Sequence, residues 1–195
     1  MNKTARPKKR DAEILNAAAE VFAQRGYHGA STKDIADRLG IQQAGIYHYF
    51  KSKDAALAEV CHIGVTGFLD HLRDISASDL AADEKVRRAI AEHLRPFRER
   101  RQYNQVFLNE RRYLVGENRK RVTALARKYE RALQAIFEQG VRAGTFRGDL
   151  DCRLATLAML GMCNAVPLWY GSASDADIDA IAAAYAEILL RGVSA

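Results

Sequence analysis

The sequence predicts an all-α fold. Only 3 of the 195 residues are proline, alanine and leucine are frequent, and no long run of alternating β-branched residues occurs. A chain of this length can bury a large core within one compact helical protein. We therefore expect a series of helices separated by short breakers.

The segment 32–53 predicts a helix, a tight turn and a second helix. Thr32 stands at the N-cap position of the first helix, where its hydroxyl can accept a bond from a backbone N–H, and Asp34 adds negative charge near the positive helix end. Gly40 can adopt the left-handed conformation that ends this helix. The second helix is expected at about 42–49.

The second helix carries polar side chains that would be out of place in a core. Glutamine can bond to both edge atoms of adenine in the major groove, and tyrosine or histidine can reach phosphate oxygens. The pattern therefore predicts sequence-specific DNA binding by a helix-turn-helix. The residues expected to contact DNA are Thr32, Lys33, Gln42, Gln43, Ala44, Gly45, Tyr47, His48, Tyr49 and Lys53.

This segment closely resembles the TetR-family pattern T-x-x-I-A-x-x-x-G-V-S-x-G-x-L-Y-x-H-F-x-S-K, and residues 14–27 resemble the family's first helix. Gln42, Ala44 and Tyr49 replace the usual Ser, Gly and His, so the resemblance implies the docking mode but not the operator sequence. The positions that match as they stand are Thr32, Ile35, Ala36, Gly40, Tyr47, Phe50, Ser52 and Lys53.

Charge is distributed unevenly along the chain. Residues 1–60 carry a net +3, 61–84 a net −4, 85–153 a net +10 and 154–195 a net −3. Five of the first ten residues are Lys or Arg, which predicts a disordered basic arm over 1–10 that neutralises phosphates or enters the minor groove. The basic stretch 85–153 indicates a second anionic partner, although many of its cations must lie on solvated helix faces.

The expected domains are the arm at 1–10, a three-helix DNA-binding domain at 11–54 and a larger helical ligand-binding and dimerisation domain at 55–195. The last two expected helices are the most apolar, which is typical of an interface. The family resemblance implies a homodimer through these helices on a palindromic operator, with reading helices about one helical turn (~34–36 Å) apart. The helices expected after the DNA-binding segment are 52–75, 83–100 with a kink at Pro96, 102–114, 117–143, 151–170 and 175–191.

Aromatic, methionine and a few polar residues in the larger domain are typical of a small-molecule site. Gly161 inside a helix costs roughly 1 kcal/mol relative to alanine, which indicates close approach of a backbone or ligand. The residues expected to bind ligand are Arg98, Tyr103, Phe107, Glu110, Arg111, Tyr113, Met162, Asn164 and Trp169.

The C-terminal half more weakly resembles the TetR branch that answers to acyl-coenzyme A thioesters in fatty-acid, aromatic-acid or sterol breakdown. That resemblance implies an acyl-CoA effector, whose apolar tail and phosphorylated head would suit the apolar interior and the basic stretch. The matching residues are Phe146, Arg147, Asp149, Leu150, Asp151, Gly161, Met162, Asn164, Trp169 and Tyr170.

The expected function is a ligand-responsive DNA-binding regulator, by default a repressor that its ligand releases. The alternatives are a TetR-like regulator that answers to a free acid or drug-like molecule and, with less support, an acyl-CoA-binding module or enzyme without DNA binding. No H-E-x-x-H, G-x-S-x-G or phosphate-binding glycine loop is present, so no enzyme is expected. Glu92 and His93 are interpreted as a partly exposed surface pair.

Cys61, Cys152 and Cys163 are odd in number and lack C-x-x-C spacing. We expect reduced thiols and no metal or cofactor, with a redox sensor as the alternative. The apolar stretch 154–168 is too short and interrupted to span a membrane, and the N-terminus lacks the apolar segment of a secretory signal. A cytoplasmic location is expected.

Overall fold

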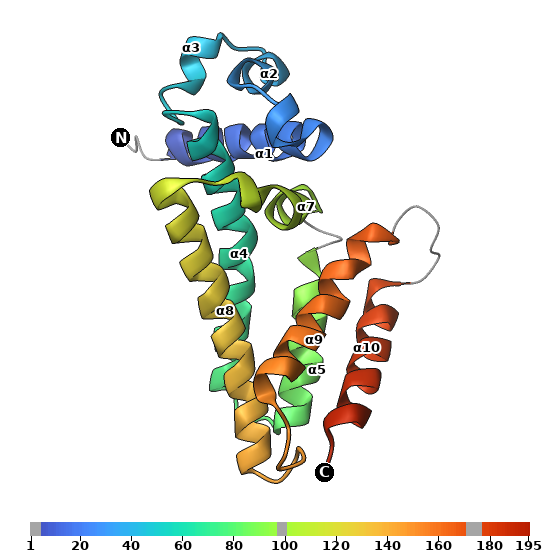
Figure 1. Cartoon of the computed structure of the whole chain (residues 1–195). Coiled ribbons are helices and arrows are strands. Elements are labelled where there is room, and N and C mark those ends of the chain that lie inside the picture. Colours follow the sequence, from blue (N-terminus) through green and yellow to red (C-terminus); the bar gives the residue numbers. More distant parts are fainter. Residues whose placement is uncertain (1–4, 97–100, 171–176) are drawn as a thin grey trace. The chain divides into compact units, whose positions relative to one another are not determined.

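The computed structural model describes residues 5–96, 101–170 and 177–195 and is built from helices (Figure 1). Within these ranges there is no strand, only an isolated antiparallel bridge between Phe146 and Ser194. The predicted all-α fold is confirmed. The elements are α1 (Ala5–Gly29), α2 (Thr32–Arg38), α3 (Gln43–Ile46), α4 (Lys53–Ala77), α5 (Ala82–Leu94), α7 (Arg101–Glu110), the 3-10 turn η1 (Arg111–Tyr113), α8 (Gly116–Arg142), α9 (Cys152–Ala165), the 3-10 turn η2 (Val166–Leu168) and α10 (Ile178–Val193).

The chain forms two compact units. The first unit comprises residues 1–65 and 102–124, and the second comprises residues 66–101 and 125–195. The helices α4 and α8 each contribute residues to both units. A segment of more than twenty residues from the middle of the chain thus belongs with the N-terminal helices.

The first helix begins earlier than expected. α1 starts at Ala5, so the prediction of a disordered arm is wrong for residues 5–10; residues 1–4 lie outside the described part. Alanine, arginine and lysine favour helices, and Pro7 falls in the first turn, where a backbone N–H would have no partner within the helix.

α2 begins with a reciprocal cap at Ser31. The Oγ of Ser31 accepts a bond from the N–H of Asp34 at 3.1 Å, and the Asp34 carboxylate accepts one from the N–H of Ser31 at 2.8 Å. The expectation that Thr32 is the N-cap is therefore wrong: Thr32 is the first helical residue and is buried. Gly40 has φ +63°, which confirms its predicted left-handed conformation after α2.

α3 is shorter than the helix predicted at 42–49. It ends at Ile46, and the next three residues form a turn. These three residues, Tyr47, His48 and Tyr49, all carry rings with lower helix propensity, and Gly45 weakens the helix further. Ser52 caps the next helix, since its Oγ accepts a bond from the N–H of Ala55 at 3.1 Å.

In the second unit, α5 packs against α9 and α10, and α9 and α10 also contact each other (Figure 1). The turn after α8 folds Phe146 back onto that helix. A Cβ built on Gly140 would lie 2.2 Å from the Phe146 ring, so only glycine leaves room for this ring. The rings of Phe137 and Phe146 lie 5.8 Å apart in the resulting core.

Several boundaries in the second unit differ from expectation. α5 ends at Leu94 instead of continuing through a kink at Pro96 to residue 100, and residues 97–100 lie outside the described part. α9 gives way to the η2 turn because Pro167 cannot donate a helical backbone bond. Apart from its own helix backbone, no described atom lies within 4 Å of a Cβ built on Gly161, so no other described backbone approaches it closely; the approach of a ligand there stays a prediction. No described helix is long and apolar enough to cross a membrane.

Candidate DNA interface and effector site

The helix-turn-helix presents a polar surface. Tyr47 is 52% exposed and Tyr49 is 42% exposed, although tyrosine is a large side chain that a core could bury. Ile46 and Phe50 are buried beneath them and anchor this segment. Of the residues predicted to contact DNA, those with exposed side chains are Lys33, Gln42, Gln43, Ala44, Tyr47, His48 and Tyr49, while Gly45 is half-buried.

Thr32 links the two helices of this motif. Its Oγ1 accepts a hydrogen bond from Gln43 Nε2 at 2.8 Å. Thr32 is only 7% exposed, so its side chain makes its contacts within the motif. The bond restricts the rotamers of Gln43, the first residue of α3, and orders its amide before any DNA is bound.

Lys53 also makes its hydrogen bonds within the DNA-binding segment. Its Nζ donates to the backbone oxygens of Tyr27 at 2.8 Å and Ala30 at 2.9 Å, and lies 4.4 Å from the centre of the Tyr27 ring. These contacts join the start of α4 to the end of α1 and to Ala30, which follows it. Charge-assisted bonds of this kind are stronger than neutral ones, so Lys53 holds the helix-turn-helix against α4.

α7 contacts the first helix through three polar bonds within the first unit. The Glu110 carboxylate accepts a bond from the backbone N–H of Tyr27 at 2.7 Å. The hydroxyl of Tyr103 donates to Asn16 Oδ1 at 2.7 Å, and Gln105 Nε2 donates to the backbone oxygen of Ala23 at 3.1 Å. α7 and the α2–α3 pair lie on opposite sides of α1 (Figure 1).

Two glycines contribute to these contacts in different ways. Gly26 has φ +67°, a left-handed conformation that favours glycine, and it lies beside the Glu110 carboxylate. A Cβ on Gly64 would lie 3.2 Å from the backbone oxygen of Tyr103 and 3.3 Å from Phe107 Cβ, so Gly64 lets α7 approach α4. The turn at Gly26 directs the Tyr27 N–H at the Glu110 carboxylate.

An aromatic stack continues the contact beyond α7. The rings of Tyr27 and Tyr113 are stacked with centroids 5.8 Å apart, and His28 meets the Tyr113 ring edge-on at 4.4 Å. The Arg112 guanidinium lies 4.9 Å from the centre of the Tyr113 ring. Offset aromatic contacts add stabilisation beyond their buried area, so η1 is fixed against the end of α1.

A polar network lies in the core of the second unit. His93 is 4% exposed, and its Nδ1 lies 2.8 Å from the Tyr129 hydroxyl and its Nε2 3.0 Å from Asn164 Oδ1. Burial lowers the pKa of His93 to about 4 and raises that of Tyr129. Phe68 stacks on the imidazole at 4.8 Å. The interpretation of His93 as half of an exposed surface pair is wrong; Glu92 instead lies beside Arg95, at 2.8 Å.

The residues predicted to bind an effector fall in both units. Phe107 and Arg111 lie together, with the guanidinium 4.5 Å from the ring centre. Arg98 lies outside the described residues. The first unit holds Tyr103, Phe107, Glu110, Arg111 and Tyr113, and the second holds Met162, Asn164 and Trp169.

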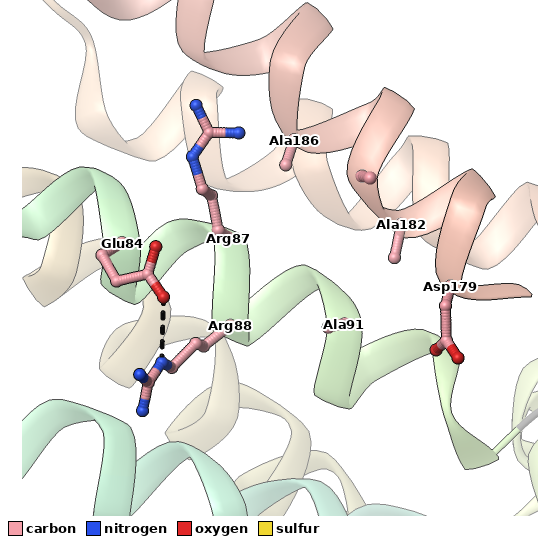
Figure 2. Close-up of a pocket in the computed structure, with 8 residues that line it drawn as sticks. Glu84, Arg87, Arg88, Ala91, Asp179, Ala182 and Ala186 are labelled. Carbon is pink, nitrogen blue, oxygen red and sulfur yellow. Dashed lines mark hydrogen bonds and ion pairs between the residues drawn. The ribbon is translucent and has the colours of Figure 1, made fainter.

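A groove of about 310 Å³ lies between α5 and α10 (Figure 2). Alanines line the α10 side, and Arg88 pairs with Glu84 at 3.0 Å on the α5 side. Arg87 pairs with Glu187 at 3.4 Å. None of the residues predicted to bind an effector lines this groove. Its lining is Glu84, Arg87, Arg88, Ala91, Asp179, Ala182, Ala183 and Ala186.

The last two helices carry apolar side chains on their outer faces. Leu154 is 61% exposed on α9 and Ile188 is 62% exposed on α10. Between them in sequence, Leu168 is 82% exposed and Trp169 is 40% exposed. Exposed large apolar side chains on successive elements are typical of a protein interface.

The cysteines are free thiols, and burial raises the pKa of Cys61 and Cys163 to about 12. Cys152 is half-buried, and burial raises its pKa as well. Low thiolate content makes a thiol a poor nucleophile and a poor redox sensor. Among the described residues, no group of three or more His, Cys, Asp or Glu side chains could hold a metal ion.

Several residues that organise these sites were missed in the sequence. Tyr129 accompanies His93, and Asn16 accepts the bond from Tyr103. The burial of His93 could be predicted from the sequence, because His93 continues the apolar spacing of Ala89 and Ile90 on α5. The contact of Asn16 could not be predicted, because its partner lies 87 positions away.

Comparison with known proteins covers both units. Residues 14–60 match the family model "Bacterial regulatory proteins, tetR family", and residues 79–193 match the model "Tetracyclin repressor-like, C-terminal domain". The transcriptional repressor KstR2 of Rhodococcus jostii is 28% identical over 95% of this chain and 91% of its own length.

Two solved structures with bound ligands are similar over most of the chain. AibR in complex with isovaleryl coenzyme A and operator DNA is 25% identical, with a TM-score of 0.85 over 93% of this chain and 98% of AibR. FadR from Bacillus subtilis in complex with stearoyl-CoA is 26% identical, with a TM-score of 0.80 over 93% of this chain and 98% of FadR. With its two models together spanning most of the sequence, the chain belongs to the TetR family of bacterial transcriptional regulators, which bind DNA and are not enzymes.

Proposed function

We propose that this regulator is a repressor that is released from a palindromic operator by an acyl-CoA thioester. The observation that carries the proposal is the similarity over nearly the whole chain to AibR, whose structure holds both isovaleryl coenzyme A and operator DNA. The similarity to FadR bound to stearoyl-CoA supports the same effector class with a longer acyl chain.

The charge of the chain supports an effector with a phosphorylated head. Residues 85–153 carry a net +10 although they lie outside the DNA-binding domain 11–54. Part of this charge is already paired, since Arg121 bonds to Glu59 at 2.6 Å and Lys120 to Glu117 at 2.6 Å. Among the residues proposed to bind effector, Arg98 and Arg111 are the cations assigned to the head group.

For DNA, we assign base and phosphate contacts to the exposed residues on and around α3. Thr32 and Lys53 act instead as positioning residues, because their polar atoms hold Gln43 and the end of α1. The basic residues within 1–10 supply phosphate contacts, so operator affinity should weaken as salt rises. The contacts are assigned to Lys33, Gln42, Gln43, Ala44, Gly45, Tyr47, His48 and Tyr49.

The functional form is a homodimer in the cytoplasm. The exposed apolar faces of α9 and α10 supply the interface, and a two-fold dimer presents two reading helices to the two halves of a palindrome. The working domains are the basic residues 1–10, the DNA-binding domain 11–54 and the ligand-binding and dimerisation domain 55–195.

Release of the operator follows from the thermodynamic linkage between effector binding and DNA binding. An effector that prefers a different spacing of the two reading heads lowers operator affinity, and DNA lowers effector affinity by the same factor. α4 is one route for this coupling because it belongs to both units. α7 is another, since Tyr103, Glu110 and Tyr113 connect it and η1 to α1.

A thermal-shift screen tests the effector class. The purified protein is heated with isovaleryl-CoA, stearoyl-CoA, the matching free acids, coenzyme A alone and cationic dyes. A ligand at ~100 times its Kd stabilises the folded state by about 2.7 kcal/mol, which the melting temperature reports. Stabilisation by thioesters, followed by their release of operator DNA, supports the proposal. Stabilisation by acids or dyes alone would instead indicate a TetR regulator with another signal.

A further inference from the structure

In the buried network of the second unit, the donor and the acceptor of each hydrogen bond can be assigned. Asn164 Oδ1 has no hydrogen to give, so His93 Nε2 must be the donor of the 3.0 Å bond between them. The ring is neutral because burial keeps the pKa of His93 at about 4, and a neutral imidazole carries one N–H. His93 Nδ1 therefore accepts, and the Tyr129 hydroxyl donates across 2.8 Å.

The hydrogen bond that His93 Nε2 donates fixes the orientation of the Asn164 amide. Its oxygen is held by His93, so the planar group must direct its two Nδ2–H bonds elsewhere. Asn164 is half-buried, and among the described residues Nδ2 has no hydrogen-bond acceptor. Nδ2 is still accessible to solvent, so a ligand that reaches it can supply the acceptor in place of water.

The aromatic rings beside the His93–Asn164 bond, together with Asn164 and its neighbours, come from four helices. Phe68 of α4 stacks on His93 of α5, and the Tyr129 ring of α8 lies 5.7 Å from Phe68. On α9, Cys163 next to Asn164 is buried and Met162 is half-buried. A single amide donor beside an aromatic wall is how small-molecule sites fix the orientation of a mostly apolar ligand.

We propose that Asn164 Nδ2 donates a hydrogen bond to the carbonyl oxygen of the effector's acyl group, and that His93 and Tyr129 are positioning residues that hold the amide in this orientation. The inference rests on the proposed acyl-CoA function and adds the chemical group that the protein reads. A thioester carbonyl is an acceptor without a hydrogen of its own, which matches a donor-only amide nitrogen. Coenzyme A alone and thioether analogues lack this acceptor.

The test compares each thioester with its thioether. Dissociation constants are measured by calorimetry for isovaleryl-CoA and stearoyl-CoA and for the S-alkyl-CoA analogues in which a methylene replaces the carbonyl. One hydrogen bond of this kind should make the thioester bind about tenfold more tightly than the thioether in the unaltered protein. Asn164→Leu should reduce this ratio to about one by weakening the thioester alone.

Tyr129→Phe tests the positioning role, because it removes the donor to His93 Nδ1 while keeping the ring. The ratio should fall although the variant still binds thioethers, whereas a purely structural defect would weaken both ligands equally. Asn109→Leu is the matched control: Asn109 is exposed on α7, and its replacement should leave the ratio unchanged.

The outcomes separate this inference from the proposed function. Equal binding of thioester and thioether by the unaltered protein, or an unchanged ratio in Asn164→Leu, overturns the carbonyl assignment and leaves acyl-CoA as the effector. Binding of neither ligand class, together with no stabilisation by thioesters, overturns both. If Asn164→Leu fails to fold, the ratios of the unaltered protein and of Tyr129→Phe still decide.

Discussion

Glu110 accepts the backbone N–H of Tyr27 at 2.7 Å, across 83 positions of sequence. The bond joins α7 to the end of α1, immediately before the helix-turn-helix. It forms where Gly26 takes a left-handed conformation, so the turn and the carboxylate fit one another. Any movement of α7 within the first unit must therefore shift or break a bond to the DNA-binding segment.

Replacing Glu110 with alanine should lower the free energy of unfolding by about 1–3 kcal/mol, because the Tyr27 N–H loses its acceptor. Glu110→Gln keeps an acceptor and should cost less. Urea denaturation measures both. The control is Glu117→Ala, since Glu117 makes only a surface pair with Lys120 and should change stability by less than ~0.5 kcal/mol. Equal stability of the two alanine variants would remove Glu110 from the proposed coupling route.

Tyr47 and Lys53 should behave differently when each is replaced by alanine. Tyr47 is 52% exposed, so its loss should abolish operator binding without changing the melting temperature. Lys53→Ala should lower both the operator affinity and the melting temperature, because two backbone carbonyls lose their charged donor. The expected loss in the free energy of unfolding is about 1–3 kcal/mol. Fluorescence anisotropy with an operator duplex and thermal unfolding separate the two effects. Unchanged operator affinity in Tyr47→Ala would overturn the docking assignment.

Local features of this fold can be predicted from the sequence, whereas contacts between distant residues cannot. The helix-turn-helix was predictable because its signals are local: Gly40 ends one helix and polar side chains mark the next. The use of Lys53 inside the motif was not, because its acceptors lie 23 and 26 positions earlier and depend on how helices pack. The polarity of His93 predicts an exposed side chain, whereas its place on the buried face of α5 puts it in the core.

Charges on the outer faces of α9 and α10 should prevent dimerisation. Ile188→Glu and Leu154→Glu each place a carboxylate in the proposed apolar interface, where its desolvation has no compensating partner. Light scattering should show a monomer for each variant and a dimer for the unaltered protein. Val115→Glu is the matched control, because Val115 is 63% exposed in the first unit, close to the 62% and 61% of the two interface residues. A dimer in all three variants would place the interface elsewhere.

Acidification should destabilise the protein through His93. Its pKa of about 4 in the fold lies below the ordinary value of 6.5, so between these values the unfolded chain binds a proton that the folded chain does not. The stability due to neutral His93 is therefore complete above pH 6.5 and is lost as pH falls toward 4, by at most about 1.4 kcal/mol per pH unit. Urea denaturation from pH 7.5 to pH 5 should show this slope.

His93→Gln should remove that part of the slope, because glutamine does not titrate in this range. The variant should start less stable than the unaltered protein at pH 7.5 and lose less stability by pH 5. His48→Gln is the comparison variant, because it makes the same substitution at a histidine that is exposed on the helix-turn-helix. Parallel pH profiles for His93→Gln and the unaltered protein would mean that His93 takes up its proton equally in both states, which its burial between Tyr129 and Asn164 opposes.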